Sequence, residues 1–436
     1  MAEGSRSAAS KDEVKAAAFA KYVVRILFIS LVLDLLSFTM ILPLFPRLLN
    51  FYRDQPNNVM LNSVLKYLNS YKAAFARPIS ARFDVVLLGG AMGSLFSLLQ
   101  AFASPIIGSL SDKFGRRTAL LYSMLGNILS VALWVVAYNF PVFITSRVVG
   151  GLSEGNVQLA LAIATDVSTP ETRGSALALV GIAFSVAFTF GPMIGAYLSQ
   201  QTFSTANPFA AAATFSLGLL LLETAFLYAK LPETRPLQSK KQGEAKTSTK
   251  GLGMLSLIHF FFLFIFSGME FSLPFTTFDL FNYSSKDNGR LLGFVGLLAA
   301  VLQGGFTRRV PPLTVVKTGL FSAAVSFFLL GHTDCQKGLY LAAAFLAVTS
   351  ATVVTGLTAL TSMLGGEKER GKMLGGFRAA GQVGRALGPI VFCTFYWWAG
   401  RELAYFTGGV GMLLVAGLFW LSIKDSEKLV EEKKKQ

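Results

Sequence analysis

The stretch GSLSDKFGRR, residues 108–117, carries one aspartate, one lysine and two arginines within ten positions. An uncharged hydrophobic run, VVLLGGAMGSLFSLLQAFASPII, leads into it, and a second run, TALLYSMLGNILSVALWVVAY, leads out of it. Each run is long enough to cross a hydrocarbon core of about 30 Å as a helix that rises about 1.5 Å per residue. The pattern predicts two membrane-spanning helices joined by a short charged loop.

The composition extends this interpretation to the whole chain. Of the 436 residues, 53% are hydrophobic and 14% are charged, and the mean hydropathy is +0.55, whereas a soluble domain has about 25% charged residues. The net charge of +15 could indicate nucleic acid, but the basic residues flank apolar runs and form no soluble basic face. We therefore expect a multi-pass membrane protein whose partner is the lipid bilayer and not a nucleic acid.

Twelve apolar spans follow one another along the chain in two groups of six. An open sheet edge in lipid would leave backbone groups unpaired, so these spans are assigned as helices. The sequence predicts an all-α membrane protein with twelve transmembrane helices in two six-helix bundles, residues 23–229 and 253–423. The spans are 23–46, 85–108, 118–138, 141–164, 175–198, 208–229, 253–274, 288–306, 313–331, 339–364, 372–398 and 404–423.

The polar segments outside the spans indicate the orientation. With the tail 1–22, the linker 230–252 and the basic tail 424–436 all in the cytosol, most Lys and Arg residues fall on the cytosolic side. Membrane proteins keep basic residues on the inner side in this way. Both termini are predicted to be cytosolic, and we expect no cleavable signal peptide before the first span.

An internal repeat relates the two groups of spans. ETRG at 171–174 is followed by FGP at 190–192, and KERG at 368–371 is followed by LGP at 387–389, with the same separation in both pairs. Each pair opens the fifth span of its group. Two halves repeated in the same orientation are one way in which transporters are built, with the substrate site near the midplane between them.

Four motifs in order resemble the major facilitator superfamily. GSLSDKFGRR is similar to the loop motif after its second helix, RVVGG (147–151) to its fourth-helix arginine motif, and GPMIGA (191–196) to its fifth-helix antiporter motif. LDLLSFTMILPLFP (33–46) resembles the first helix of bacterial tetracycline/proton antiporters. The antiporter-motif residues are Gly191, Pro192 and Gly195.

The resemblance spans all twelve helices and implies the major facilitator fold. It is strongest to the eukaryotic tetracycline-transporter-like branch of the drug:proton antiporters. Two departures stand out, because QGGFTRR (303–309), the second-half counterpart of the loop motif, lacks an aspartate, and the antiporter motif ends in Ala196 where the family often has glycine.

The charged loop is interpreted as a cytosolic gate. Its candidate residues are Gly108, Asp112, Gly115, Arg116 and Arg117. Gly108 and Gly115 allow close approach and a tight turn, and Asp112 can accept charge-assisted hydrogen bonds from arginines or from the N-terminus of a neighbouring helix. The resemblance implies that this cluster closes the cytosolic side when the carrier faces outward. A loop that only sets topology is the alternative; it explains the basic residues but neither the aspartate nor the glycines.

Buried charges mark the candidate proton-coupling site. An ionisable group inside a bundle is costly unless it is paired, so it is a functional candidate. Asp34 lies in the first span, and Arg147 and Glu154, seven residues apart, are expected on one face of the fourth. We expect both acids to compete for Arg147, with one carboxyl exchanging a proton during the cycle. A static ion pair that never titrates is the alternative.

Other polar residues within spans are candidate substrate ligands. Glu270 lies in the seventh span and could contact substrate, and Gln100 and Gln303 occupy matching places in the second and eighth spans. The two glutamines could donate to substrate or simply bond between helices.

Two arginines in the eleventh span suggest a negatively charged substrate. Arg378 and Arg385 lie seven residues apart in FRAAGQVGRALGP (377–389), on one stripe of the helix and about 10 Å apart along its axis. A guanidinium at this depth stays charged and must find an anion. We expect Arg385 to hold a substrate carboxylate, with Arg378 as entry partner. Arg385 could instead pair structurally with Glu270, and Arg378 could reach cytosolic water or lipid phosphate.

The sequence thus predicts a secondary active transporter that exports an amphipathic organic solute, an organic anion or a drug, in exchange for protons. A facilitative carrier or symporter is the alternative, and a non-transporting scaffold or receptor would need none of the buried charges. We expect a monomer without enzymatic activity, a cofactor or a metal.

The expected location is an endomembrane (endoplasmic reticulum, vacuole or lysosome) or the plasma membrane. Asn282 in NYS could be glycosylated and KKKQ (433–436) could be a retrieval signal, although a chance match and a simple basic tail explain them equally well.

Overall fold

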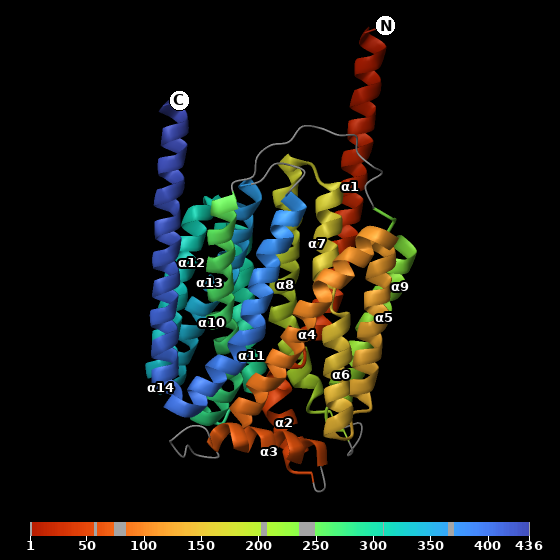
Figure 1. Cartoon of the computed structure of the whole chain (residues 1–436). Coiled ribbons are helices and arrows are strands. Elements are labelled where there is room, and N and C mark those ends of the chain that lie inside the picture. The colour runs from red at the N-terminus through yellow and green to blue at the C-terminus, as the bar shows by residue number, and fades with distance from the viewer. Residues whose placement is uncertain are drawn as a thin grey trace.

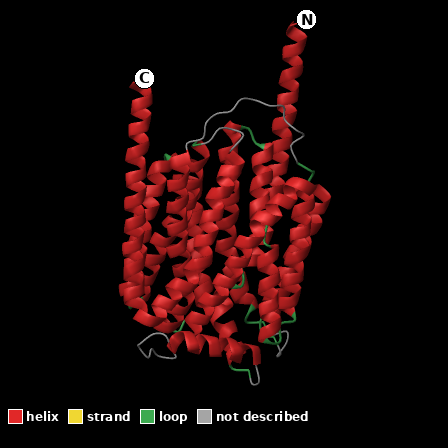
Figure 2. Cartoon of the chain, viewed as in Figure 1, coloured by secondary structure: helices red, strands yellow, loops and turns green. Residues whose placement is uncertain are grey.

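The computed structural model consists of helices joined by short loops and turns in the residues that it describes, which are 2–55, 59–73, 84–201, 207–234, 249–307, 309–364 and 370–435 (Figure 2). Ten of its helices are long and apolar enough to cross a membrane within these residues. The central part of the predicted linker, 235–248, and the start of the second KERG repeat, 368–369, lie outside the described residues, as do Arg308 and the final Gln436.

The first half of the chain runs through ten helical elements. They are α1 (Ala2–Thr39), η1 (Leu42–Leu44), α2 (Phe45–Arg53), α3 (Val59–Ala73), α4 (Asp84–Phe114), α5 (Arg116–Val135), α6 (Phe140–Ser153), α7 (Asn156–Val167), α8 (Pro170–Leu198) and α9 (Ala210–Lys230). The long α1 ends shortly before Pro43 and Pro46, because a proline ring has no N–H to continue the helical hydrogen bonds. The chain then turns through η1 into α2.

The second half has six elements. They are α10 (Thr249–Phe281), α11 (Ser285–Leu302), η3 (Gln303–Thr307), α12 (Pro312–His332), α13 (Gln336–Met363) and α14 (Arg370–Lys435). A capping box in which Ser284 and Asp287 bond each other's backbone N–H starts α11, and η3 is a π-helical turn at its end. Gly400, with φ +83°, interrupts α14 with a non-helical conformation, and the chain reverses there (Figure 1). The predicted spans 372–398 and 404–423 are therefore the two arms of α14.

The fourth predicted span, 141–164, is not one helix. It is divided into α6 and α7, and Glu154 and Gly155 lie between them. The side chain of Ser123 bridges this break, since its hydroxyl donates to the Ser153 carbonyl and accepts from the Gly155 N–H at 3.1 Å. Non-helical backbone at membrane depth is tolerated where such internal partners satisfy it.

Both chain ends lie at the same end of the molecule, and α3 lies across the opposite end (Figure 1). We call these the termini end and the far end. Each half has its own packing: α1 packs against α8 and α9 in the first half, and α10 and α12 pack against α14 in the second. The halves meet where α4 contacts α14 and where α8 contacts α11.

The contacts between the halves are tightest toward the far end. A Cβ atom on Gly90 of α4 would come within 2.7 Å of the Pro389 carbonyl of α14, and one on Gly296 of α11 would collide with the backbone of Thr189 in α8. The Ile390 N–H of α14 also donates to Ser94 Oγ of α4 at 2.9 Å. Glycine at these positions lets the two halves approach backbone to backbone.

Candidate functional site: a cavity between the halves

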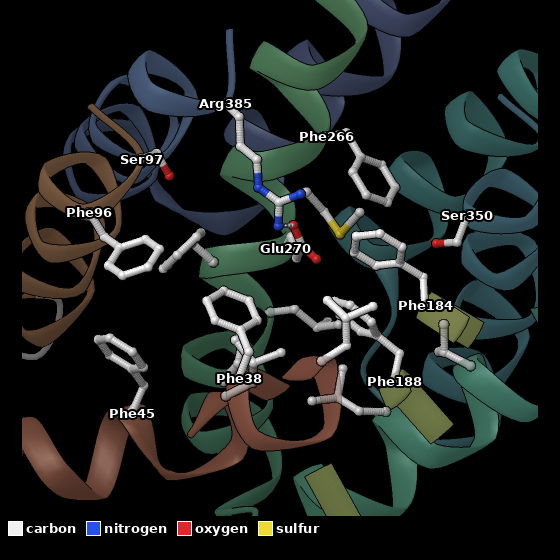
Figure 3. Close-up of a pocket in the computed structure, with 18 of the residues that line it drawn as sticks. Phe38, Phe45, Phe96, Ser97, Phe184, Phe188, Phe266, Glu270, Ser350 and Arg385 are labelled. Atoms are coloured by element: carbon white, nitrogen blue, oxygen red, sulfur yellow. Dashed lines mark hydrogen bonds and ion pairs between the residues drawn. The ribbon is translucent and has the colours of Figure 1, made fainter. Parts of the chain in front are cut away.

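A cavity of about 160 Å³ lies between the two halves and is walled by side chains from both. Its aromatic wall consists of Phe38, Phe45, Phe96, Phe184 and Phe188 from the first half and Phe266, Phe271 and Phe275 from the second. Six of these side chains are labelled in Figure 3. The polar lining residues are few: Ser97, Gln100, Glu154, Glu270, Ser350, Gln382 and Arg385. A mostly apolar cavity with a few convergent polar groups is the usual form of a small-molecule site.

The charged centre of the cavity is a pair formed by Arg385 and Glu270 (Figure 3). Arg385 Nη2 of α14 donates to Glu270 Oε2 of α10 at 3.0 Å, and their side chains are 29% and 23% exposed. Of the two arrangements that the sequence left open for Arg385, the structure shows the pairing with Glu270. Because both side chains remain accessible from the cavity, the pair can still be separated by an arriving anion.

The other predicted ligands have different surroundings. Gln100 lines the cavity, as expected. Gln303 is buried in η3 and accepts a hydrogen bond from Ser185 Oγ of α8 at 2.6 Å, so it joins the two halves instead of lining the cavity. Arg378 lies two turns before Arg385, is half-buried, and is not among the lining residues.

Sequence reasoning missed three polar lining residues, Ser97, Ser350 and Gln382. Gln382 carries a buried Oε1 atom that has no hydrogen-bond partner within the described residues. It stands in the same stretch as the two arginines, three residues before Arg385. Its position on the arginine stripe was the signal that could have identified it.

A second polar cluster lies in the first half, around a small cavity of about 40 Å³ lined by Asp34, Asn127, Arg147 and Glu154. Asp34 is 3% exposed, and its Oδ1 accepts from Asn156 Nδ2 at 2.8 Å. Glu154 Oε2 accepts from Asn127 Nδ2 at 3.2 Å. Since Glu154 also lines the central cavity, it lies between the two cavities.

The structure brings the three predicted proton-coupling residues to one cavity. The prediction that Arg147 and Glu154 lie on one face of a single helix is wrong. Glu154 follows the end of α6, so Arg147 and Glu154 do not share a helix stripe. Arg147 Nη2 donates to Ser146 Oγ at 3.0 Å, and its guanidinium lies over the rings of Phe143 and Trp134, at 5.5 and 5.6 Å. Within the described residues no ion pair joins it to Asp34 or Glu154. A static ion pair is therefore not formed in this conformation.

One buried acid of the first half was not predicted. Glu223 of α9 is fully buried, and its Oε1 accepts from Ser30 Oγ of α1 at 2.6 Å. The run LLLLETAF (219–226) contains it as the single charged residue, and this was the signal that the sequence carried.

The charged loop forms a compact network at the start of α5. Arg116 lies 2.6 Å from Asp112 Oδ1 and donates from Nε to Asp166 Oδ2 of α7 at 2.8 Å. Gly115 has φ +101°, a conformation that favours glycine, and the turn there directs the Arg116 N–H to Glu233 Oε1 at 2.8 Å. These bonds link α4, α5, α7 and the segment after α9.

Two further members of the predicted gate take part in packing within the first half. Arg117 donates to the Tyr228 carbonyl of α9 at 2.7 Å, and a Cβ atom on Gly108 would lie 3.0 Å from Gln158 Nε2 of α7. Asp166 and Glu233 were not predicted as members of this network, because both come from segments distant in sequence. The bonds described here hold the first half together at the termini end.

The predicted antiporter motif packs α8 against two neighbouring helices. A Cβ atom on Gly191 would collide with Thr39 of α1, and one on Gly195 with the Met40 carbonyl. Thr39 Oγ1 also donates to the Ala187 carbonyl of α8 at 3.1 Å. Pro192 lies within α8, and its carbonyl is 3.0 Å from where a Cβ on Gly289 of α11 would lie. The motif therefore stands at the contact between the halves.

Comparison with known proteins agrees with this architecture. Residues 27–337 match the family model described as Major Facilitator Superfamily. Major facilitator superfamily domain-containing protein 10 of Mus musculus is 33% identical over 443 residues, which cover 94% of this chain and 95% of the relative. The class C tetracycline resistance protein of Escherichia coli is 26% identical over 321 residues, 70% of this chain and 79% of that protein.

Among solved structures, that of the human organic anion transporter MFSD10 (TETRAN) superposes with a TM-score of 0.79. It is 31% identical in sequence, and the match covers 92% of this chain and 99% of that one.

Proposed function

Since this chain belongs to the major facilitator superfamily, a family of multi-pass membrane transporters, we propose that it carries an organic anion across the membrane by alternating access. In this proposal it spans the membrane twelve times: α6 with α7 forms one span, and the two arms of α14 form two. Both termini face the cytosol, and the membrane is an endomembrane or the plasma membrane.

The observation that carries the proposal is Arg385 in the cavity between the halves. A guanidinium keeps its charge even when water is scarce, so it needs an anionic partner at all times. Glu270 is that partner here, at 3.0 Å. A substrate carboxylate can take the place of Glu270 beside the guanidinium of Arg385, while the phenylalanine wall accepts the apolar part of an amphipathic molecule. The related human protein, an organic anion transporter, supports this substrate class.

The second element of the proposal is proton coupling by Asp34, Glu154 and Arg147. The resemblance of residues 33–46 to the first helix of tetracycline/proton antiporters, together with a tetracycline resistance protein among the relatives, supports export in exchange for protons as the proposed direction. Asp34 Oδ2 is buried without a hydrogen-bond partner in the described part of the chain, a position in which a carboxyl gains from binding a proton. Glu154 lies between the small cavity and the central one, so its charge can respond to a substrate in the latter.

The Arg385–Glu270 pair favours a second candidate, symport of the anion with a proton. An anion that takes the place of Glu270 beside Arg385 adds one negative charge to the cavity, and a proton carried in with it would balance that charge. Anion and proton would then bind together. A facilitative carrier, the remaining alternative, would require neither proton antiport nor proton symport.

The experiment is flux into proteoliposomes that contain the purified protein, with matched anionic and neutral solutes. Arg385→Gln should abolish anion flux and spare the neutral solute, and Arg290→Gln, which alters an exposed arginine of α11, should change neither. Equal loss of both solutes in Arg385→Gln would reduce Arg385 to a structural role.

A further inference from the structure

Glu223 has the surroundings of a proton-binding group rather than of an ion pair. Its side chain is fully buried, and Oε2 has no hydrogen-bond partner within the described residues. Ser30 Oγ donates to the other oxygen at 2.6 Å. Among those residues no lysine, arginine or histidine forms an ion pair with it. One donor is too few for an ionised carboxylate away from water, and a proton on Oε2 removes the charge that the site does not balance.

The position of Glu223 relates it directly to Asp34. Two of the polar contacts that join α1 to α9 lie one heptad apart, Ser30 with Glu223 and Ser37 with Ser216. Tyr22 Oη also donates to the Lys230 carbonyl at 3.1 Å. Ser216 Oγ also donates to the Ser37 carbonyl at 2.8 Å. Asp34 lies four residues after Ser30 and three before Ser37, so it is on the same stripe of α1. Glu223 thus faces the helix stripe that carries the proposed coupling carboxyl.

Structural joining of the two helices does not require an acid at this position. At the level of Ser37 two serine side chains join α1 to α9. At the level of Ser30 the same task is done by a buried carboxyl, which is costly to place there unless its ionisation is used.

The helices packed against α9 carry further charged and titratable groups. On α1 they are Asp34 and, toward the termini end, Lys21, Tyr22 and Arg25; on α5 they are Arg116, Arg117 and Tyr122; and among the described side chains of α8 there is Tyr197. Arg117 is held by the Tyr228 carbonyl near the end of α9. Asp34 on α1 and Glu154, at the break between α6 and α7, are acids, so they add no positive charge that would balance an ionised Glu223.

We propose that Glu223 is a second proton-binding carboxyl of the first half, which holds its proton in this conformation and exchanges it, like Asp34, during transport. The proton binds one carboxylate oxygen and takes the side chain from −1 to neutral; it leaves to water when the site opens. The inference rests on the proposed proton coupling and extends it from one carboxyl to two.

Infrared difference spectroscopy of the purified full-length protein in lipid tests this without a substrate. The wild type should show a protonated-carboxyl carbonyl band that is absent in Glu223→Gln and disappears as the pH is raised. Ser30→Ala should shift the band to higher frequency, because the hydrogen bond to Oε1 is lost. Glu402→Gln, at a side chain 79% exposed, is the matched control and should leave the band unchanged.

A Glu223→Gln spectrum that has lost no protonated-carboxyl intensity relative to the wild type would show that Glu223 is ionised and overturn the proposal, because the remaining intensity belongs to other carboxyls such as Asp34. A Glu223 band that persists at every pH would also overturn it, because that proton would never exchange. Glutamine can keep the bond from Ser30, and Ser30→Ala leaves the carboxyl in place, so the two variants together separate protonation from misfolding. If wild-type flux proved independent of a pH gradient, the proposed coupling would fail while the infrared titration still decided the protonation of Glu223.

Discussion

Arg385 and Glu270, from two neighbouring helices of the second half, form an ion pair in the wall of the cavity between the halves, with Nη2 and Oε2 3.0 Å apart. Glu270 therefore competes with a substrate anion for the guanidinium of Arg385. Glu270→Gln should strengthen anion binding by about fivefold, because the carboxylate–guanidinium pair is replaced by an amide–guanidinium hydrogen bond that is weaker by about 1 kcal/mol. Equilibrium binding of a fluorescent organic anion measures this change.

The same variant distinguishes the two coupling schemes. If the anion and the proton bind together at this pair, Glu270→Gln loses anion accumulation driven by a pH gradient, whereas coupling through Asp34 leaves that accumulation intact. Accumulation in Glu270→Gln that depends on the gradient as in the wild type would exclude Glu270 from coupling.

The close backbone contact between Gly296 and Thr189 predicts that a larger side chain at position 296 separates the two halves at the far end. A methyl group on Gly296 has no room, so Gly296→Ala should destabilise the closed far end by about 1–3 kcal/mol, the cost of overpacking. Distances between spin labels on Lys66→Cys and Lys337→Cys, in a chain whose own cysteines are replaced, should shift toward longer values.

Gly218→Ala supplies the control for this variant, because a Cβ atom there meets open space. Identical distance distributions for Gly296→Ala and Gly218→Ala would mean that the α8–α11 contact does not limit closure.

The hydrogen-bond and ion-pair network of the charged loop, residues 108–117, predicts a variant that folds normally but transports slowly. In Asp112→Asn the guanidinium of Arg116 keeps Asp166 at 2.8 Å, so expression and thermal stability should stay near wild type. Transport should slow, because Asp112 is the member of this network assigned to the gate. Asp54→Asn, at another exposed aspartate, is the control and should transport normally. Full activity of Asp112→Asn would leave the loop with only a topological role.

Replacement of Asp34 should cause the clearest loss of proton coupling. Asp34→Asn removes the titratable group but can still accept from Asn156 Nδ2, so the first half should remain folded. Anion accumulation driven by a pH gradient should be lost, while exchange of labelled for unlabelled anion without a gradient continues. Accumulation that depends on the gradient as in the wild type would exclude Asp34 from coupling.

Much of the fold was predictable because lipid allows few solutions. Apolar runs of membrane length must be helices, and the repeated motifs relate the two halves. The break after Ser153 was not predictable, since it depends on Ser123 of another helix, which supplies the bonds that the backbone lacks. The expected common face of Arg147 and Glu154 failed for this reason.

The site was predictable where a residue type alone restricts the environment. Arg385 needed an anion in any fold, and Glu270 was one of the few acids within reach. Gln100 and Gln303 show the limit of such reasoning: they occupy matching places in sequence, yet one lines the cavity and the other bonds to Ser185. Whether a glutamine side chain lines the cavity or bonds to another helix depends on how the two halves pack together. The sequence pattern of one chain does not contain that information.

The most direct test of proton-coupled anion transport is anion flux in proteoliposomes under imposed pH gradients of opposite sign. Antiport predicts that the anion accumulates on the side with the higher proton concentration, that reversing the gradient reverses the accumulation, and that Arg385→Gln shows neither. Accumulation on the side with the lower proton concentration would identify symport, and equal anion concentrations on both sides under either gradient would contradict proton coupling.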